Sequence, residues 1–94
     1  MSEIELKKFG MTLTDRADGQ KAFASIVKNH QQPYVLNFNG VMSMGSSFGD
    51  EVVVRLARIQ GNQIAIFNAN DGIKNCISRV IEETGIAVNF QVKI

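Results

Sequence analysis

Residues that support disulfides, metal sites and rigid turns are scarce in this sequence, which contains one cysteine, one histidine, one proline and no tryptophan. The single cysteine, Cys76, cannot form an intrachain disulfide, and its apolar neighbours indicate a small buried side chain rather than a nucleophile. With His30 as the only histidine, the ligand spacings of a zinc site are absent. We therefore expect no metal and no cofactor.

An excess of charge and long apolar runs are missing as well. Ten Lys and Arg residues balance nine Asp and Glu residues and are interspersed with them, for a net charge of +1. This contrasts with the basic stripe of nucleic-acid-binding proteins. No apolar run approaches the roughly 20 residues of a membrane-spanning helix, and the opening MSEIELKKFG lacks the apolar core of a signal peptide. We expect a soluble, cytoplasmic protein that binds neither nucleic acid nor membrane.

The length and the apolar content are those of one small globular domain. The chain has 94 residues, 45% of them hydrophobic, which is enough for a single modest core and leaves no room for a second domain. We therefore treat residues 1–94 as one domain. Because its core is small, a homodimer formed through a sheet edge or a helix face would be a natural supplement to its stability.

Segments typical of strands alternate with segments typical of helices along the chain. We expect strands at 3–9, 34–38, 63–67 and 87–92, the first and last at the edges of the sheet. We expect helix N-caps at Thr14, Ser47 and Asp71. The order β-α-β-α-β-α-β predicts an α/β fold with a four-stranded, mostly parallel sheet and three helices.

The first of these helices contains Gly19, and its expected end is followed closely by Pro33. Proline forbids continuation of the helix. Glycine in a helix interior costs about 1 kcal/mol relative to alanine. We therefore expect the ordered part of this helix to begin nearer Asp18.

The stretch from 35 to 58 predicts a buried strand, a tight glycine- and serine-containing loop and a helix that begins near Asp50 and Glu51. Backbone N–H groups at a helix start are unpaired and carry partial positive charge. Ser46 and Ser47 can therefore cap the helix, hold an anion or accept a covalent phosphate. The spacing of Ser47 and Asp50 is that of a capping box, which favours Ser47 as the cap and leaves Ser46 free.

Several polar residues follow strands that should end at one edge of the sheet. In parallel sheets, ligand and partner sites gather at the carboxyl ends of the strands. The candidates for one shared surface are Arg16, Ser46, Ser47, Asp50, Glu51, Asn68 and Asn70. Arg16 is either a free surface residue or the ion-pair partner of Asp50 or Glu51, whereas Asn68 and Asn70 also suit turn and capping positions.

The loop residues 45–49 match the G-x-S-x-G pattern of a hydrolase nucleophile elbow. That chemistry requires an acid and then a histidine after the serine, and the only histidine, His30, precedes Ser47. We therefore reject this match and predict that the protein is not an enzyme.

Short motifs in a fixed order run through most of the chain: LT followed by Arg16, NFNGV at 37–41, SFGDE at 47–51 and NA at 68–69. With these motifs the chain resembles the STAS-like family of small prokaryotic domains, whose function is largely unassigned. One departure is Asn37, where the family usually carries an aspartate at the strand end.

More distant relatives implied by this resemblance are the STAS domains of anti-anti-sigma factors. In those domains a serine at a helix start is phosphorylated by a partner kinase with an ATP-binding domain, which abolishes binding to that partner. Ser46 occupies the phosphoacceptor-like position here, with Gly45 and Phe48 in place of the usual aspartate and glycine. The resemblance implies a non-enzymatic regulatory protein-interaction module with an ATPase-type kinase as its partner and Ser46 as a candidate phosphoserine.

Two other functions remain as alternatives. A small-molecule or nucleotide-phosphate binding domain would use Ser46 and Ser47 with Arg16 and Asn68, although Asp50 and Glu51 oppose an anion there. A self-assembling structural protein would pair through an edge strand, either the one containing Ile4 and Leu6 or the one containing Val88 and Phe90.

Overall fold

The computed structural model describes residues 2–92, and its centre is a parallel sheet of four strands in the order β1-β3-β5-β6. The strands are β1 (Ser2–Glu5), β3 (Tyr34–Asn37), β5 (Gln63–Phe67) and β6 (Ala87–Gln91). All three neighbouring pairs run parallel. The prediction of an α/β fold with a four-stranded parallel sheet is confirmed.

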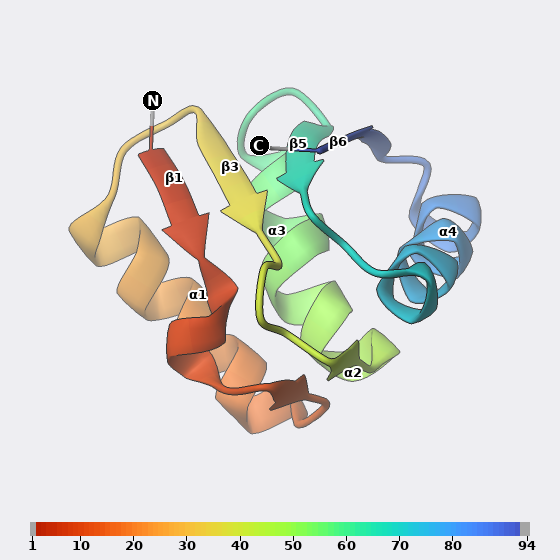
Figure 1. The fold of residues 1–94 in the computed structure, drawn as a ribbon. Helices are drawn as coiled ribbons and strands as arrows, with labels where there is room; N and C mark the ends of the chain where they lie inside the picture. Colours follow the sequence, from red (N-terminus) through yellow and green to blue (C-terminus); the bar gives the residue numbers. More distant parts are fainter. Residues whose placement is uncertain (1, 93–94) are drawn as a thin grey trace.

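The helices lie on one face of this sheet, as Figure 1 shows with the strands along the top and the helices below them. They are α1 (Arg16–Asn29), α4 (Asp71–Thr84) and a continuous helical segment from 46 to 58. This segment consists of α2 (Ser46–Gly49), a π-helical turn η2 (Asp50–Val54) and α3 (Arg55–Arg58), and we call it the α2–α3 segment. No helix within residues 2–92 is long and apolar enough to cross a membrane.

The core lies between the sheet and this helical layer. The strand register places apolar side chains of all four strands in one row across the sheet: Ile4, Leu36, Ile66 and Phe90. Fully buried helix residues pack against them, among them Phe48, Val52, Leu56, Ile73 and Ile77. The opposite face carries no helix in the described part of the chain and presents polar side chains such as Gln63 and Asn89.

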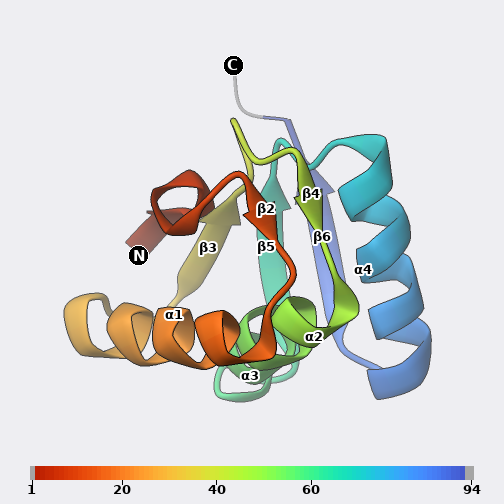
Figure 2. The ribbon, with the colours of Figure 1, turned by 90° about the horizontal axis from the view of Figure 1, so that it is seen from below.

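A second, two-stranded sheet was not predicted. β2 (Thr12–Leu13) pairs in parallel with β4 (Ser43–Met44). Backbone hydrogen bonds extend the pairing on both sides, because the Met42 N–H donates to the Met11 carbonyl and the Gly45 N–H to the Leu13 carbonyl. These short strands carry the chain from the carboxyl edge of the main sheet to the starts of α1 and α2 (Figure 2).

The first strand is shorter than expected. It ends at Glu5, and the 3-10 helix η1 (Leu6–Phe9) follows, so the predicted strand at 3–9 is wrong in its second half. Leu6 is buried in this turn, and Gly10 adopts a φ of 136°, a conformation that favours glycine. The turn redirects the chain toward β2, which a strand continuing to residue 9 could not reach.

Each predicted helix cap is displaced. Asp15, not Thr14, caps α1 by accepting hydrogen bonds from the N–H groups of Ala17 and Asp18. Asn70, not Asp71, caps α4 by accepting from the Ile73 N–H. In both cases the side chain that precedes the first turn makes the bond, as an N-cap must. The α2–α3 segment begins at Ser46 rather than near Asp50 and Glu51, and it has Gly45 at its N-cap position and no side-chain cap. The predicted start of this helix and the predicted capping role of Ser47 are therefore both wrong.

Helix α1 begins at Arg16, so Gly19 does not delay its start as expected. Gly19 is buried where α1 crosses the α2–α3 segment. A Cβ atom at this position would lie 2.9 Å from the Glu51 Cβ and 3.3 Å from the Phe48 Cα. The glycine therefore permits a close helix crossing, and the packing gained there offsets its low helix propensity.

Candidate functional site

The structure separates the predicted site residues into two groups. Asn68 and Asn70 lie in the loop after β5, at the carboxyl edge of the main sheet. Figure 2 shows that β4 runs from this edge to α2, which lies beside the start of α1 at the other end of the helical layer. Arg16, Ser46, Ser47, Asp50 and Glu51 belong to that end. The expectation of one shared edge is therefore wrong for the two asparagines, because β2 and β4 intervene.

Arg16 joins α1 to the π-helical turn of the α2–α3 segment. Its Nη1 lies 2.7 Å from Glu51 Oε2 and its Nη2 lies 3.5 Å from Asp50 Oδ2. The hydrogen bond that Arg16 donates to Glu51 is the main cause of a raised pKa for its guanidinium, which stays charged at all relevant pH values. Of the two roles considered for Arg16, the ion pair is confirmed, and it involves both Asp50 and Glu51.

Arg55 completes this surface network. Its Nη1 lies 3.3 Å from Glu51 Oε1, and its guanidinium stacks 3.8 Å above the centroid of the Phe23 ring on α1. Glu51 is thereby held between two arginines, with only 15% of its side chain exposed. Exposed ion pairs contribute at most about 1 kcal/mol each. We therefore assign the network to fixing the orientation of this surface rather than to global stability.

Ser46 is exposed at the first position of the α2–α3 segment. It borders a small recess of about 170 Å³ between this segment and α4. The recess is lined by Met44, Gly45, Ser46, Cys76, Arg79 and Glu83. Within residues 2–92, Arg79 makes no ion pair and no hydrogen bond, in contrast to Arg16 and Arg55. The recess is therefore lined by a serine at a helix start and by an arginine that has no ion-pair partner within residues 2–92.

Cys76, which lines the recess, and Ser47, which follows Ser46, are poorly placed to act as reactive groups. Cys76 is buried, and the loss of solvent raises the pKa of its thiol, although the nearby charge of Arg79 opposes that shift. The thiol is therefore protonated at neutral pH, in agreement with the prediction of a structural cysteine. Ser47 is half-buried, and Asp50, its expected capping-box partner, pairs with Arg16 instead.

Asn37 links three strand ends and was not predicted to do so. Its Nδ2 donates to Glu3 Oε2 at 3.1 Å, and its Oδ1 accepts from the Asn39 N–H at 2.9 Å and from Asn68 Nδ2 at 3.2 Å. Asn37 is the one buried polar residue among the described residues. A lone polar residue at the end of an apolar strand was the signal for this role, but the sequence does not reveal its partners.

The two other asparagines also have structural roles. Asn68 adopts a φ of 61° in the turn after β5, and Asn70 donates from its Nδ2 to the Met42 carbonyl while its Oδ1 caps α4. Their interpretation as turn and capping residues is confirmed.

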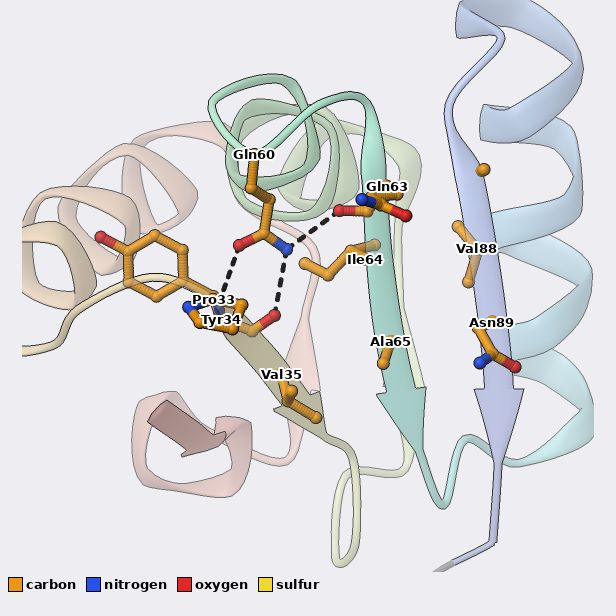
Figure 3. A pocket seen from close by; sticks show the side chains of 10 residues that line it. Pro33, Tyr34, Val35, Gln60, Gln63, Ile64, Ala65, Val88 and Asn89 are labelled. Atoms are coloured by element: carbon orange, nitrogen blue, oxygen red, sulfur yellow. Dashed lines mark hydrogen bonds between the residues drawn. The ribbon is translucent and has the colours of Figure 1, made fainter. Parts of the chain in front are cut away.

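The sequence analysis did not identify a role for Gln60. Its side-chain amide bridges β3 and β5 by hydrogen bonds to backbone groups of both strands, as Figure 3 shows. Its Oε1 accepts from the Tyr34 N–H at 2.8 Å, and its Nε2 donates to the carbonyls of Tyr34 at 3.1 Å and Gln63 at 2.9 Å. A cavity of about 380 Å³ opens beside it at the amino ends of the strands. None of the lining residues carries a charge, so this cavity does not suit an anion such as a phosphate.

The described residues contain no group of three His, Cys, Asp or Glu side chains placed to hold a metal ion. A scan against protein-family models, a search of curated proteins and a search of solved structures each found no match for this chain. The structure itself defines the fold class of the protein, a single α/β domain built on a parallel sheet. Membership of the STAS-like family stays a prediction from the sequence motifs.

Proposed function

We propose that this protein is a non-enzymatic regulatory interaction module. It binds a protein partner through the surface formed by Arg16, Ser46, Ser47, Asp50 and Glu51, which we call the Ser46 surface, and phosphorylation of Ser46 switches that binding. The observation that carries the proposal is that Ser46, exposed at a helix start, lines the same recess as Arg79, which has no ion-pair partner within residues 2–92. The order of motifs that resembles STAS-like domains supports it.

A phosphate on Ser46 has a favourable electrostatic environment. It adds a charge of about −1.5 to −2 at neutral pH, which the N–H groups of the helix start and a nearby arginine stabilise. Arg79 lines the same recess and can form a charge-assisted hydrogen bond to phosphate oxygens. Asp50 and Glu51, which would repel a phosphate, are already paired with Arg16 and Arg55. Among the residues that line the recess, only Glu83 opposes the phosphate directly.

The partner class follows from the resemblance, an ATPase-type kinase that both binds and modifies the module. In the transfer, the Ser46 hydroxyl oxygen forms a bond to the γ-phosphorus of ATP, ADP leaves, and the hydroxyl proton passes to a base on the kinase. The new charge and bulk then lie on the surface that the kinase contacts. Release of the partner is the expected consequence.

The first test is the intact mass of the protein purified from its own host. We expect a phosphate-sized increment in the wild type and in Ser47→Ala, and no increment in Ser46→Ala. Ser47→Ala is the matched control because it removes the neighbouring hydroxyl. An increment that persists in Ser46→Ala would refute the assignment of the phosphorylation site.

The second test is binding to a candidate kinase with and without a charge at position 46. We expect Ser46→Asp to weaken the complex at least tenfold, and Ser46→Ala to leave it within about twofold of wild type. Equal binding of wild type and Ser46→Asp would overturn the switch. Failure of the wild type to bind any such kinase would overturn the partner class.

A further inference from the structure

The main sheet has two outer strands, and each pairs with one neighbour only in the described part of the chain. β1 pairs with β3, and β6 pairs with β5. The unpaired backbone groups of an outer strand form a template for pairing with another chain, and proteins usually protect such edges with charges, prolines or very short strands. The two edges of this sheet differ sharply in that protection.

The β1 edge is protected by negative charge. The Ser2 N–H donates to the Pro33 carbonyl on the β3 side, so alternation along the strand turns the backbone groups of Glu3 and Glu5 outward. Antiparallel pairing of two β1 strands would place Glu3 of one copy opposite Glu5 of the other, and like charges opposite each other are destabilising. The strand also ends at Glu5, where η1 begins.

The described residues of the β6 edge carry no such protection. The Ala87 N–H donates to the Asn62 carbonyl at 2.8 Å, and the Gln91 carbonyl accepts from the Asn68 N–H at 3.0 Å. Both bonds point toward β5, so alternation turns the N–H and C=O groups of Val88 and Phe90 outward. The five residues of β6, AVNFQ, include neither a charge nor a proline.

We infer that β6 pairs with the β6 strand of a second copy of this chain, antiparallel and with the two-fold axis at Asn89. In this register Val88 lies opposite Phe90 of the second copy. Because both residues direct their backbone groups outward, they exchange both N–H···O bonds as a hydrogen-bonded pair. Asn89 then lies opposite Asn89 as a non-hydrogen-bonded pair, and the two parallel sheets join into one.

The side chains of β6 are self-complementary in this register. On the helical face, half-buried Val88 and Phe90 form cross-strand pairs of a β-branched and an aromatic residue, which are among the favourable ones. On the open face, Ala87 lies opposite Gln91 and the two Asn89 amides meet, so no like charges are opposed. This neutral self-complementarity favours a second copy over a charged peptide as the occupant of the edge.

Pairing at β6 is independent of the proposed regulatory function. It concerns the edge of the sheet, whereas the Ser46 surface belongs to the starts of α1 and α2 in the helical layer. A dimer built this way would present two copies of the Ser46 surface. A partner with two docking sites would then bind with increased avidity without any new contact.

The first experiment is disulfide trapping at the two-fold axis. Asn89→Cys in a Cys76→Ser background should form a covalent dimer in more than half of the molecules under mild oxidation, because directly opposed Cβ atoms lie within about 5.5 Å. Gln63→Cys in the same background is the matched control, since it is exposed on the same face but belongs to β5. It should stay monomeric on a denaturing gel. A cross-link in the control alone, or in neither variant, would overturn the register.

The second experiment is charge complementation by light scattering. Wild type should show the dimer mass at high concentration, whereas Asn89→Lys and Asn89→Glu should each be monomeric, and an equimolar mixture of the two should regain the dimer mass. Gln63→Lys should remain dimeric and controls for added charge on the open face. A monomeric wild type, a dimeric Asn89→Lys or a mixture that stays monomeric would each refute pairing at β6.

Discussion

At the scale of single residues, the side-chain amides of Asn37 and Gln60 link the ends of neighbouring strands, and the pattern of apolar residues does not predict these links. Asn37 joins the ends of β1, β3 and β5, and Gln60 bridges β3 and β5 at their other end. A carboxamide both donates and accepts, so it can satisfy a backbone carbonyl, a backbone N–H and a carboxylate at once. Replacement of either residue by the acid of the same shape removes the side-chain NH2 donor, and therefore tests whether that donor contributes to stability.

Asn37→Asp should destabilise the protein by about 2 kcal/mol at pH 7, because it replaces a donor to Glu3 by a second carboxylate. Repulsion by Glu3 and burial both raise the pKa of the new carboxyl group at position 37 in the folded state. Such a group contributes stability that is present below its unfolded pKa, about 3.9, and is lost as pH rises through its folded value. The difference from wild type should therefore shrink as the pH falls toward 4, which urea unfolding at a series of pH values measures.

A double variant provides the control for this prediction. Glu3→Gln combined with Asn37→Asp reverses the pair, so that the new amide donates to the new carboxylate. We expect it to recover at least half of the lost stability at pH 7. Equal instability of the single and double variants would show that carboxylate repulsion is not the cause.

Gln60→Ala should cost about 1–2 kcal/mol, because the N–H and C=O groups of Tyr34 lose their partners at a partly buried position. Gln60→Glu keeps the acceptor for the Tyr34 N–H but loses the donor to two carbonyls, and should be destabilised by a comparable amount at neutral pH. Thermal unfolding of both variants measures the effect. Full stability of Gln60→Glu would mean that the Nε2 bonds contribute nothing.

At the scale of the elements, the periodicity of apolar residues was sufficient to predict the main strands and helices. Segments such as 63–67 and 71–84 are long enough to show a period and end at clear signals, including Gly85 with its φ of 76°. β2 and β4 contain two residues each, too few to show any period. These short strands place the starts of α1 and α2 away from the carboxyl edge of the main sheet. Because the sequence did not predict β2 and β4, Asn68 and Asn70 were wrongly grouped with Ser46.

The crossing of α1 over the α2–α3 segment makes a prediction at this scale. Gly19→Ala gains about 1 kcal/mol in helix propensity, yet its Cβ would meet the Glu51 Cβ at 2.9 Å and the Phe48 backbone at 3.3 Å. We expect a net loss of about 1–2 kcal/mol in the free energy of unfolding, because overpacking at a buried crossing forces the helices apart.

Gly72→Ala in α4 is the matched control, since the nearest atom to its added Cβ is Asn70 Oδ1 at 3.5 Å, an ordinary contact. Its stability should equal or exceed that of wild type. Denaturant unfolding of the two variants in parallel separates propensity from packing. If both alanine variants were stabilised, Gly19 would have no role in the crossing.

At the scale of the whole molecule, the main sheet is parallel throughout, and helices of the described residues cover only one of its two faces. Parallel sheets are usually covered on both faces, and the described part of this one presents an open face and a neutral outer strand. In the proposed dimer, pairing at β6 would extend the sheet and remove this outer edge, while β1 with its acidic residues would lie at both ends of the dimer. The modest core of a 94-residue chain would gain stability from such an association.

If the chain dimerises through β6, its melting temperature must depend on protein concentration, because association stabilises only the folded state. We expect the wild-type melting temperature to rise by a few degrees over a hundredfold increase in concentration. Asn89→Lys should melt at the wild-type low-concentration value and show no such dependence, since its lysines oppose each other at the two-fold axis while its exposed position spares the monomer fold. Gln63→Lys should retain the wild-type dependence. A melting temperature that is constant with concentration in the wild type would mean that the β6 edge stays unpaired and that the monomer is stable without it.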